Sequence, residues 1–473
     1  MIDLSELTIK GACEDLKKKK FSARELTQAS LDVINEKDTD IHAFLEVFDD
    51  ALDQADEADK RIASGEFASR RMPLLGIPIA IKDNMLVEGK RATAGSKILE
   101  GFVAPYDATA IRKLKDAGAI ILGRTNMDEF AMGSSTENSA YGVTKNPHDP
   151  SRVPGGSSGG SAAAVGANFV LGSYGSDTGG SIRQPAAFSG IVGLKPTYGK
   201  VSRSGLIALA SSLDQIGPFA KTVSDVEVLY DAVRGQDPLD STTISENTYP
   251  QGKKFSKTIG IPRSFVESEG VDESVKKNFE GVIKKFQSLG YNIADIELPH
   301  LKYSLATYYI IMPAEASSNL ARFDGVKYGF HKDGKDSIDD YFKTRRMGFG
   351  QEARRRIILG TYVLSSGYYD EYYGSALKMK KLITEELKET FGKIDLIMTP
   401  TTPTPAFKIG EKTSNPLSMY LADIFTVPAN IAGLPAISLP SGFDGNLPLG
   451  VQLMAGLGRE GNLFIAGKEF LEE

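Results

Sequence analysis

Apolar residues recur at helical spacing in the first part of the chain. In residues 22–35 and 52–62 they return every three or four positions between charged residues, which predicts two amphipathic helices. The first should begin at Ser22, because Ser22 and Glu25 have the spacing of a capping box. We therefore predict that residues 1–70 form a helical arm that packs on the rest of the chain.

Beyond residue 70 the pattern changes to short apolar runs that alternate with helical stretches. The runs predict strands at residues 77–81, 119–122, 258–262, 396–400, 436–439 and 451–454. Helical spacing predicts helices at residues 109–117 and 275–286, which Gly118 and Gly290 should end. This alternation is typical of an α/β fold, so we predict a single large domain with a mixed β-sheet covered by helices on both faces.

Residues 300–392 interrupt the alternation, because their pattern is helical throughout and rich in tyrosine. We interpret them as a helical insertion that covers the functional site. On this interpretation residues 71–299 form the core that carries the site, and residues 393–473 complete its sheet. The stretch 235–257 is polar and interrupted by glycine and proline, so we interpret it as a connection.

Composition narrows the class of protein. With 41% hydrophobic and 25% charged residues among 473, the chain can bury a large core. Its formal net charge of −6 argues against a protein that binds nucleic acid by itself, since phosphate binding depends on lysine and arginine.

The sole cysteine, Cys13, excludes an internal disulfide and a cysteine metal site, and we expect a structural or interface thiol. No apolar run approaches the roughly 20 residues of a membrane span, and residues 1–6 lack a signal-peptide core, so we expect a cytoplasmic protein.

Two glycine- and serine-rich turns carry the candidate chemistry. They are residues 154–161 (PGGSSGGS) and 176–185 (SDTGGSIRQP), and between them lies a segment of small apolar residues. A phosphate-binding loop is disfavoured, because no strand precedes the first turn and no Lys-Ser/Thr pair ends it. Glycines let backbone N–H groups crowd around a reacting atom, so Ser181 could serve both as nucleophile and in an oxyanion hole.

A serine nucleophile needs a base, and the usual histidine has no candidate position here. The chain contains only His42, His148, His300 and His331, none of them in a recognisable catalytic context. Lys82 instead ends the apolar run 77–81. A lysine at that position is usually the first exposed residue after a strand. Together with the two serine turns, however, it resembles the amidase signature family.

The resemblance implies a Ser-cisSer-Lys triad and the amidase signature fold. Ser181 would be the nucleophile, Ser157 the bridging serine on a cis peptide bond, and Lys82 the base. The backbone N–H groups of residues Thr178, Gly179, Gly180 and Ser181 would form the oxyanion hole. The pKa of Lys82 must then fall from about 10.4 through burial before it can accept a proton at neutral pH.

Within the family, residues 306–310, 315–325 and 355–361 resemble the A subunits of tRNA-dependent amidotransferases. This implies a glutaminase that supplies ammonia within a heterotrimer. A B subunit would use ATP and Mg²⁺ to activate Glu-tRNA(Gln) or Asp-tRNA(Asn), and a small C subunit would join the two. This chain would hold no cofactor and no metal. Which of these two tRNAs is the substrate of the complex stays open.

The resemblance also implies residues that recognise glutamine. Arg356 would hold the α-carboxylate and Asp423 the α-amino group, while Tyr308 or Tyr309 would contribute a hydroxyl. Arg355 remains an alternative to Arg356, because adjacent helix positions face different ways.

One further residue and two further functions stay open. Ser134 could reach the site from the loop after residues 119–122, although a turn role is equally consistent. A free-standing amidase is an alternative function, and the intact triad set argues against an inactive scaffold. The chain stops at Glu473, somewhat earlier than family members usually do, so we expect a few further residues.

Overall fold

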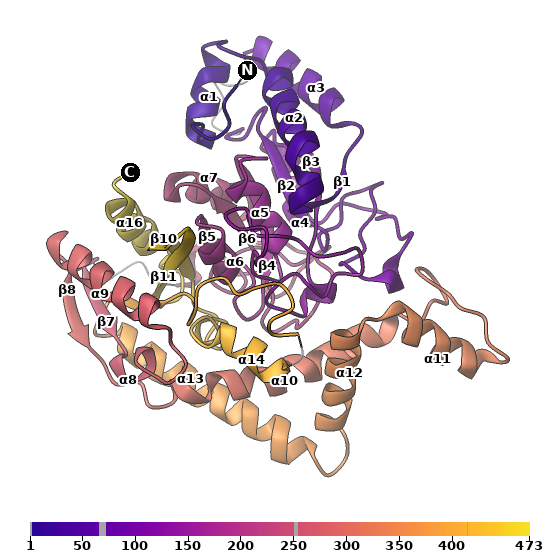
Figure 1. Ribbon diagram of the computed structural model, residues 1–473, viewed down its shortest axis with the longest axis vertical. Coiled ribbons are helices and arrows are strands. Elements are labelled where there is room, and N and C mark those ends of the chain that lie inside the picture. Colours follow the sequence, from indigo (N-terminus) through magenta and orange to yellow (C-terminus); the bar gives the residue numbers. More distant parts are fainter. Residues whose placement is uncertain (1, 66–71, 250–253, 414) are drawn as a thin grey trace.

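A mixed β-sheet runs through the centre of the protein (Figure 1). The computed structural model describes residues 2–65, 72–249, 254–413 and 415–473. Within them the strand order is β1-β3-β2-β4-β6-β5-β10-β11-β9-β7-β8. The strands are β1 (Phe44–Val47), β2 (Pro78–Lys82), β3 (Ile120–Thr125), β4 (Gly172–Asp177), β5 (Val192–Lys195), β6 (Gln215–Ala220), β7 (Thr258–Ile261), β8 (Asn292–Asp295), β9 (Leu396–Pro400), β10 (Ala436–Asp444) and β11 (Leu447–Ala455).

Helices cover both faces of this sheet, as predicted. On β2, Ile79 and Ile81 pack in one apolar cluster, while Ala80 belongs to another. Neighbouring strand residues point to opposite faces, so the two clusters lie on opposite sides of the sheet. The helices are α1 (Ile9–Lys17), α2 (Ala23–Ile41), α3 (Ala51–Ala63), α4 (Thr109–Asp116), α5 (Gly159–Gly166), α6 (Arg183–Phe188), α7 (Val223–Val233), α8 (Arg263–Val266), α9 (Glu273–Ser288), α10 (Ser304–Asn319), α11 (Ser337–Gly348), α12 (Gln351–Val363), α13 (Ser375–Phe391), α14 (Pro416–Tyr420), α15 (Val427–Ile431) and α16 (Glu460–Leu471).

The N-terminal region is not purely helical. Its helices α1, α2 and α3 form as expected, and Ser22 and Glu25 make the predicted capping box on α2. Residues 44–47, however, form β1, which pairs antiparallel with β3 at the edge of the sheet. Helix α2 also continues to Ile41 instead of ending at residue 35, because Ile41 is buried again after an exposed polar stretch.

The predicted strands of the core are present, with shifted ends. Strand β2 includes Lys82, so this lysine is the last strand residue and not the first residue after it. Strand β8 was not predicted, since its half-exposed edge position carries no apolar run. The boundary predicted at residues 70 and 71, and residues 250–253 of the predicted connection, lie outside the described residues. The division into arm, core, insertion and completion stays a prediction.

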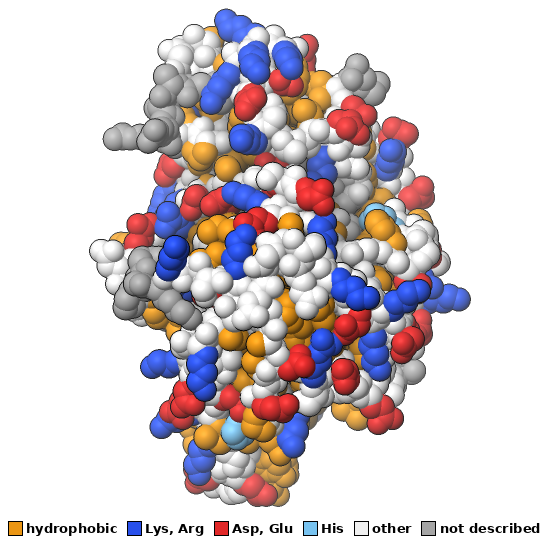
Figure 2. All heavy atoms as spheres, turned by 90° about the vertical axis from the view of Figure 1, so that its left-hand side faces the viewer, with side chains coloured by type: hydrophobic (Ala, Val, Ile, Leu, Met, Phe, Trp, Pro, Cys, Tyr) orange, Lys and Arg blue, Asp and Glu red, His pale blue; other side chains and the backbone are white. Residues whose placement is uncertain are grey.

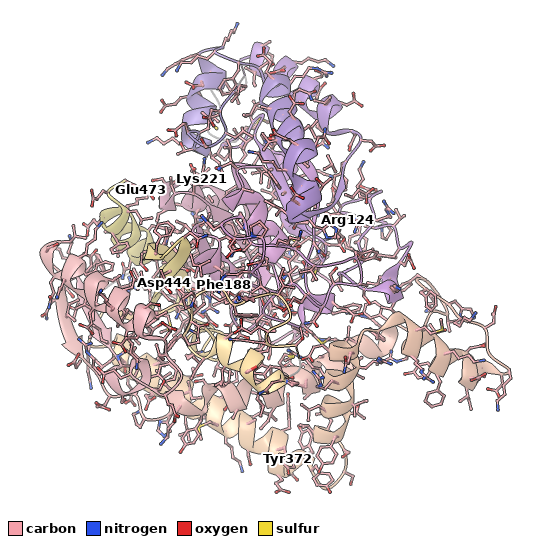
Figure 3. All side chains as sticks on the ribbon, viewed as in Figure 1. Arg124, Phe188, Lys221, Tyr372, Asp444 and Glu473 are labelled. Carbon is pink, nitrogen blue, oxygen red and sulfur yellow. The ribbon has the colours of Figure 1, made fainter. Side chains whose placement is uncertain are left out.

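The segment between β8 and β9 is helical, in agreement with its pattern. Helices α10 and α12 pack so closely that a Cβ at Gly360 would overlap the carbonyl oxygen of Pro313. Helix α11 extends away from the rest of the molecule (Figure 1). Tyr372 lies at the outer end of the segment, whereas Phe188 on α6 lies near the centre of the molecule (Figure 3). Helix α10 reaches the turn after β4, because Tyr308 packs against Gly179.

Charged side chains of both signs are interspersed over the face shown in Figure 2. That face carries no extended patch of lysine and arginine alone. Across the described parts of the chain, the helices are too short or too polar to cross a membrane.

Candidate active site

Lys82 lies in a buried cluster of serine hydroxyls. Its Nζ donates to Ser157 Oγ and Ser158 Oγ, each at 2.8 Å, and to Ser176 Oγ at 3.0 Å. The lysine comes from the end of β2, Ser176 from β4, and the two other serines from the turn before α5. Ala80, two residues before Lys82, packs in the cluster that contains α5, so strand alternation directs the lysine to that same side.

The surroundings of Lys82 favour its neutral form. The side chain is fully buried, and this burial lowers the pKa of Lys82 to about 7, although Asp128, Asp177 and Asp214 act against the shift. Burial also raises the pKa of Asp128 and of Asp214 to about 6. The lysine is therefore poised to exchange a proton near neutral pH.

Ser157 follows a cis peptide bond, between Gly156 and Ser157, as the family resemblance implied. Asp128 fixes this turn, because its backbone N–H donates to Ser157 O at 3.2 Å and its carboxylate lies where a Cβ of residue 156 would be. The same carboxylate accepts the N–H groups of Thr136 and Asn138, at 2.9 and 3.0 Å. Asp128 therefore joins the bridging-serine turn to the neighbouring loop.

Ser181 is placed beside this cluster by its own backbone. The N–H of Ser158 donates to Ser181 O at 3.3 Å. Ser181 is 8% exposed, whereas Lys82 and Ser157 are fully buried. The predicted nucleophile is thus the most accessible of the three residues.

The turn that carries Ser181 is held by Asp177. The Asp177 carboxylate accepts the N–H groups of Gly180 at 2.9 Å and Ile182 at 3.1 Å. The Gly180 amide, predicted to belong to the oxyanion hole, is therefore directed at Asp177, because the carboxylate at the end of β4 lies three residues before it. The amides of Thr178, Gly179 and Ser181 remain the predicted oxyanion donors.

Arg183 binds this turn to the C-terminal part of the chain. Its guanidinium pairs with Asp177 at 2.9 Å and also donates to Thr426 O at 2.7 Å. Burial alone would raise the pKa of Asp177, but Arg183 outweighs it and the pKa falls to about 2. Thr426 Oγ1 in turn donates to Gly179 O at 2.6 Å. The nucleophile turn and the residues around Thr426 therefore form one rigid unit.

Asp423, three residues before Thr426, accepts hydrogen bonds from two predicted site residues. Ser134 Oγ donates to its carboxylate at 2.7 Å, and Tyr309 OH at 3.3 Å. Burial raises the pKa of Asp423 to about 7, against the effects of Ser134 and Arg356. Ser134 thus contacts a predicted glutamine-binding group and does not only form a turn.

Arg356 and Arg355 differ in burial although both pair with Glu352. Arg356 is 3% exposed, its Nε donates to Glu352 Oε1 at 2.7 Å, and its Cζ lies 5.4 Å from the centre of the Tyr309 ring. The side chain of Arg355 is 39% exposed. Of the two alternatives, Arg356 is the one that contacts Tyr309, and its charge acts to lower the pKa of Asp423.

The two candidate tyrosines face different parts of the site. Tyr308 packs against the nucleophile turn, since a Cβ at Gly179 would lie 2.6 Å from its Cζ. Tyr309 contacts Asp423 and stacks on Tyr420 with ring centres 3.9 Å apart. A cavity of about 230 Å³ opens beside Arg356 and Tyr420.

Several site residues carried no assigned role in the sequence. Asp177 and Arg183 stand inside the quoted turn 176–185, and their position there is a signal that could have been used. Asp128 and Asp214 have no comparable local signal. Asp214, for example, accepts a hydrogen bond of 2.6 Å from Thr178 Oγ1, which lies 36 residues away along the chain. Their roles depend on contacts that only the fold creates.

The four histidines lie in other contacts, which agrees with the absence of a histidine base. These contacts are His42 with Val143 O, His148 with Ser189 O, His300 with Glu386 and His331 with Asp333.

A buried lysine, a serine on a cis bond and a serine in an Asp-Thr-Gly-Gly-Ser turn are the features of an amidase signature enzyme. The profile of the amidase family matches residues 25–464, and the chain belongs to this family. It is 53% identical over 474 residues to the A subunit of the glutamyl-tRNA(Gln) amidotransferase of Desulfatibacillum aliphaticivorans, with 99% of this chain and 97% of that protein covered. The same-named protein of Carboxydothermus hydrogenoformans is 53% identical over 477 residues, with the same shares covered. The solved structure of the A subunit of the Thermotoga maritima glutamyl-tRNA(Gln) amidotransferase has a TM-score of 0.80 and 43% identity, covering 98% of this chain and 94% of that one.

Proposed function

We propose that this chain is the glutaminase subunit of a tRNA-dependent amidotransferase. The observation that carries the proposal is the connection between two buried groups of side chains. Thr426 Oγ1 donates to Gly179 O in the nucleophile turn and lies 3.1 Å from Asp423 O. A serine nucleophile is thereby joined to a buried carboxylate and a buried guanidinium, and relatives of the chain at about half identity carry this subunit's name.

Glutamine fits the charges on this side of the site. A guanidinium suits its α-carboxylate and a carboxylate suits its α-ammonium group. In the proposal Arg356 binds the first and Asp423 the second, with Tyr309 between them. The side-chain amide then extends towards Ser181 past Tyr308.

In the proposed reaction, protons pass between Ser181, Ser157 and Lys82. Neutral Lys82 takes the proton of Ser157, while Ser157 takes that of Ser181, whose Oγ attacks the amide carbon of glutamine. The backbone N–H groups of Thr178, Gly179 and Ser181 stabilise the oxyanion. The proton returns through Ser157 to the leaving nitrogen, and ammonia departs. Water then cleaves the acyl ester by the same relay and releases glutamate.

The ammonia is used elsewhere in the proposed complex. A B subunit phosphorylates the carboxylate of Glu-tRNA(Gln) or Asp-tRNA(Asn) with ATP and Mg²⁺ and accepts the ammonia, while a C subunit joins the two. This chain contributes no ATP site or metal to the proposal. The net charge of −6 supports a division in which another subunit binds most of the tRNA. Such a complex works in the cytoplasm.

The test combines partner identification with an activity assay. The full chain is affinity-purified from its own cells and its partners are identified by mass spectrometry. Glutamine hydrolysis is then measured for the chain alone and for the purified complex, with each of the two tRNAs. We expect B- and C-type partners and faster hydrolysis in the complex.

The contradicting result is equally specific. A chain without partners that hydrolyses varied small amides well and glutamine poorly would be a free-standing amidase.

A further inference from the structure

The start of helix α12 is tied to the core by one buried carboxylate. Glu129 is 2% exposed and lies in a short 3₁₀ turn (Glu129–Ala131) after β3. Its Oε2 accepts the N–H of Gly350 at 2.8 Å, and Ser96 Oγ donates to its Oε1. A Cβ at Gly350 would lie 2.5 Å from Glu129 Oε2, so a larger residue at position 350 would displace the carboxylate.

Helix α12 has no cap of its own at this end. Gly350 is its N-cap residue and offers no side chain to the free N–H groups of the first turn. Glu129, 221 residues away, accepts the N–H of Gly350 itself. The carboxylate therefore ties the start of the helix to the core by a tertiary contact.

The helix that Glu129 holds carries the glutamine-binding arginine. Arg356 and Glu352 lie four residues apart, on the same face of α12, and pair at 2.7 Å. Farther along, α12 is held by α10, where Gly360 packs against the backbone of Pro313. The helix thus has several attachments, among them Tyr420 OH on Glu352 Oε1 at 3.1 Å, and Glu129 is the one at its N-terminal end.

We propose that Glu129 is a positioning residue for glutamine recognition, which holds the first turn of α12 so that Arg356 stays against Tyr309. Because glutamine is the substrate only in the proposed function, this role rests on that proposal. Displacement of a binding group by about 1 Å can lower catalysis by about 100-fold. Loss of the anchor should therefore weaken glutamine binding while Ser181 keeps its reactivity.

The experiment compares Glu129→Ala and Glu129→Gln in the full-length chain, assayed with its co-purified subunits. Glutamine retains an acceptor oxygen, so E129Q should rescue part of the loss seen in E129A. We expect KM for glutamine to rise about tenfold in E129Q and more in E129A. The rate at which a small fluorophosphonate labels Ser181 should stay within about twofold of the original.

A matched control separates this role from general helix capping. Asp225 is also a buried carboxylate at a helix start, since it accepts Ile9 N–H at 2.9 Å and Lys10 N–H at 3.1 Å on α1. Asp225→Asn should leave KM for glutamine unchanged. An equal rise of KM in D225N would overturn the proposal, because it would trace the effect to lost stability.

Hydrogen exchange measured by mass spectrometry gives a readout that needs no substrate. Residues 350–356 should exchange faster in E129A than in the original chain, while residues 357–363 should not. Unchanged KM together with unchanged exchange would overturn the proposal, and so would a labelling rate that falls as far as kcat/KM. If E129A does not fold, E129Q decides by the same criteria.

Failure of the proposed function gives a different pattern. The original chain would then take the fluorophosphonate but hydrolyse no glutamine, and the exchange at residues 350–356 would still decide whether Glu129 anchors α12.

Discussion

Lys82 Nζ donates to Ser157 Oγ at 2.8 Å, and both side chains are fully buried. A charged lysine at this position would be costly, whereas a neutral one can accept a proton from the serine. The pair therefore explains how a chain without a catalytic histidine could activate Ser181.

Substitution of the three triad residues should separate their contributions. We expect Ser181→Ala to abolish glutamine hydrolysis, and Lys82→Ala and Ser157→Ala to lower kcat by about 100-fold or more, as for other acid–base groups. Steady-state glutamate release measures all three. Near-normal turnover in Lys82→Ala would remove this lysine as the base.

The pH dependence should differ between two reactions of Ser181. Lys82 acts when neutral, and its pKa of about 7 means that labelling by a neutral fluorophosphonate should rise with pH through that value and then level off. Asp423, with a pKa of about 7, binds an ammonium group only when ionised. Glutamine kcat/KM should therefore fall more steeply than labelling on the acid side.

Asp423→Asn supplies the control for this comparison. The variant should have a raised KM for glutamine but an unchanged pH profile of labelling. A shifted labelling profile would show that Asp423 acts on Lys82 and not on the substrate.

Substitution of Arg183 should reveal the stability of the nucleophile turn. Arg183→Met leaves the Asp177 carboxylate buried without its partner, which typically costs about 3 to 5 kcal/mol. The pKa of Asp177 is depressed to about 2, so the stabilisation from its charge is present above its ordinary pKa and is lost as pH falls towards 2. We expect a clearly lower thermal midpoint at pH 7 and a smaller difference near pH 2.

An exposed ion pair gives the comparison for Arg183. Arg91 pairs with Glu46 at 3.1 Å with its side chain 54% exposed, and Arg91→Met should cost at most about 1 kcal/mol. Equal shifts of the thermal midpoint in the two variants would contradict the assigned role of Arg183.

The neighbouring arginines of α12 should differ in their effect on KM. Loss of a buried charged partner typically costs about 2 kcal/mol or more, so Arg356→Ala should raise KM for glutamine roughly 30-fold or more. Arg355→Ala should change it less, because this side chain is 39% exposed and pairs with Glu352. Kinetics with glutamine and labelling of Ser181 together measure the effect. A larger change in Arg355→Ala would reverse the assignment.

The sequence by itself determined the features that are formed by residues close together along the chain. The capping box at Ser22 and Glu25 formed as predicted, because both partners lie within one helical turn. The α/β class followed from alternating apolar runs, and the turn 176–185 indicated the nucleophile because its glycines and serine are consecutive. Lys82 could be placed at a strand end for the same reason.

The tertiary structure decided which distant groups meet. Ser134 bonds to Asp423 across 289 residues, and Glu129 bonds to Gly350 across 221. The spacing of apolar and polar residues does not predict such contacts, because the residues around each position are compatible with many distant partners. The packing of Arg356 against Tyr309 depends on the direction in which α12 faces, and the bond from the Gly180 N–H depends on the position of the Asp177 carboxylate. Burial acts in the same way, since the lowered pKa of Lys82 comes from the complete burial of its side chain in the fold.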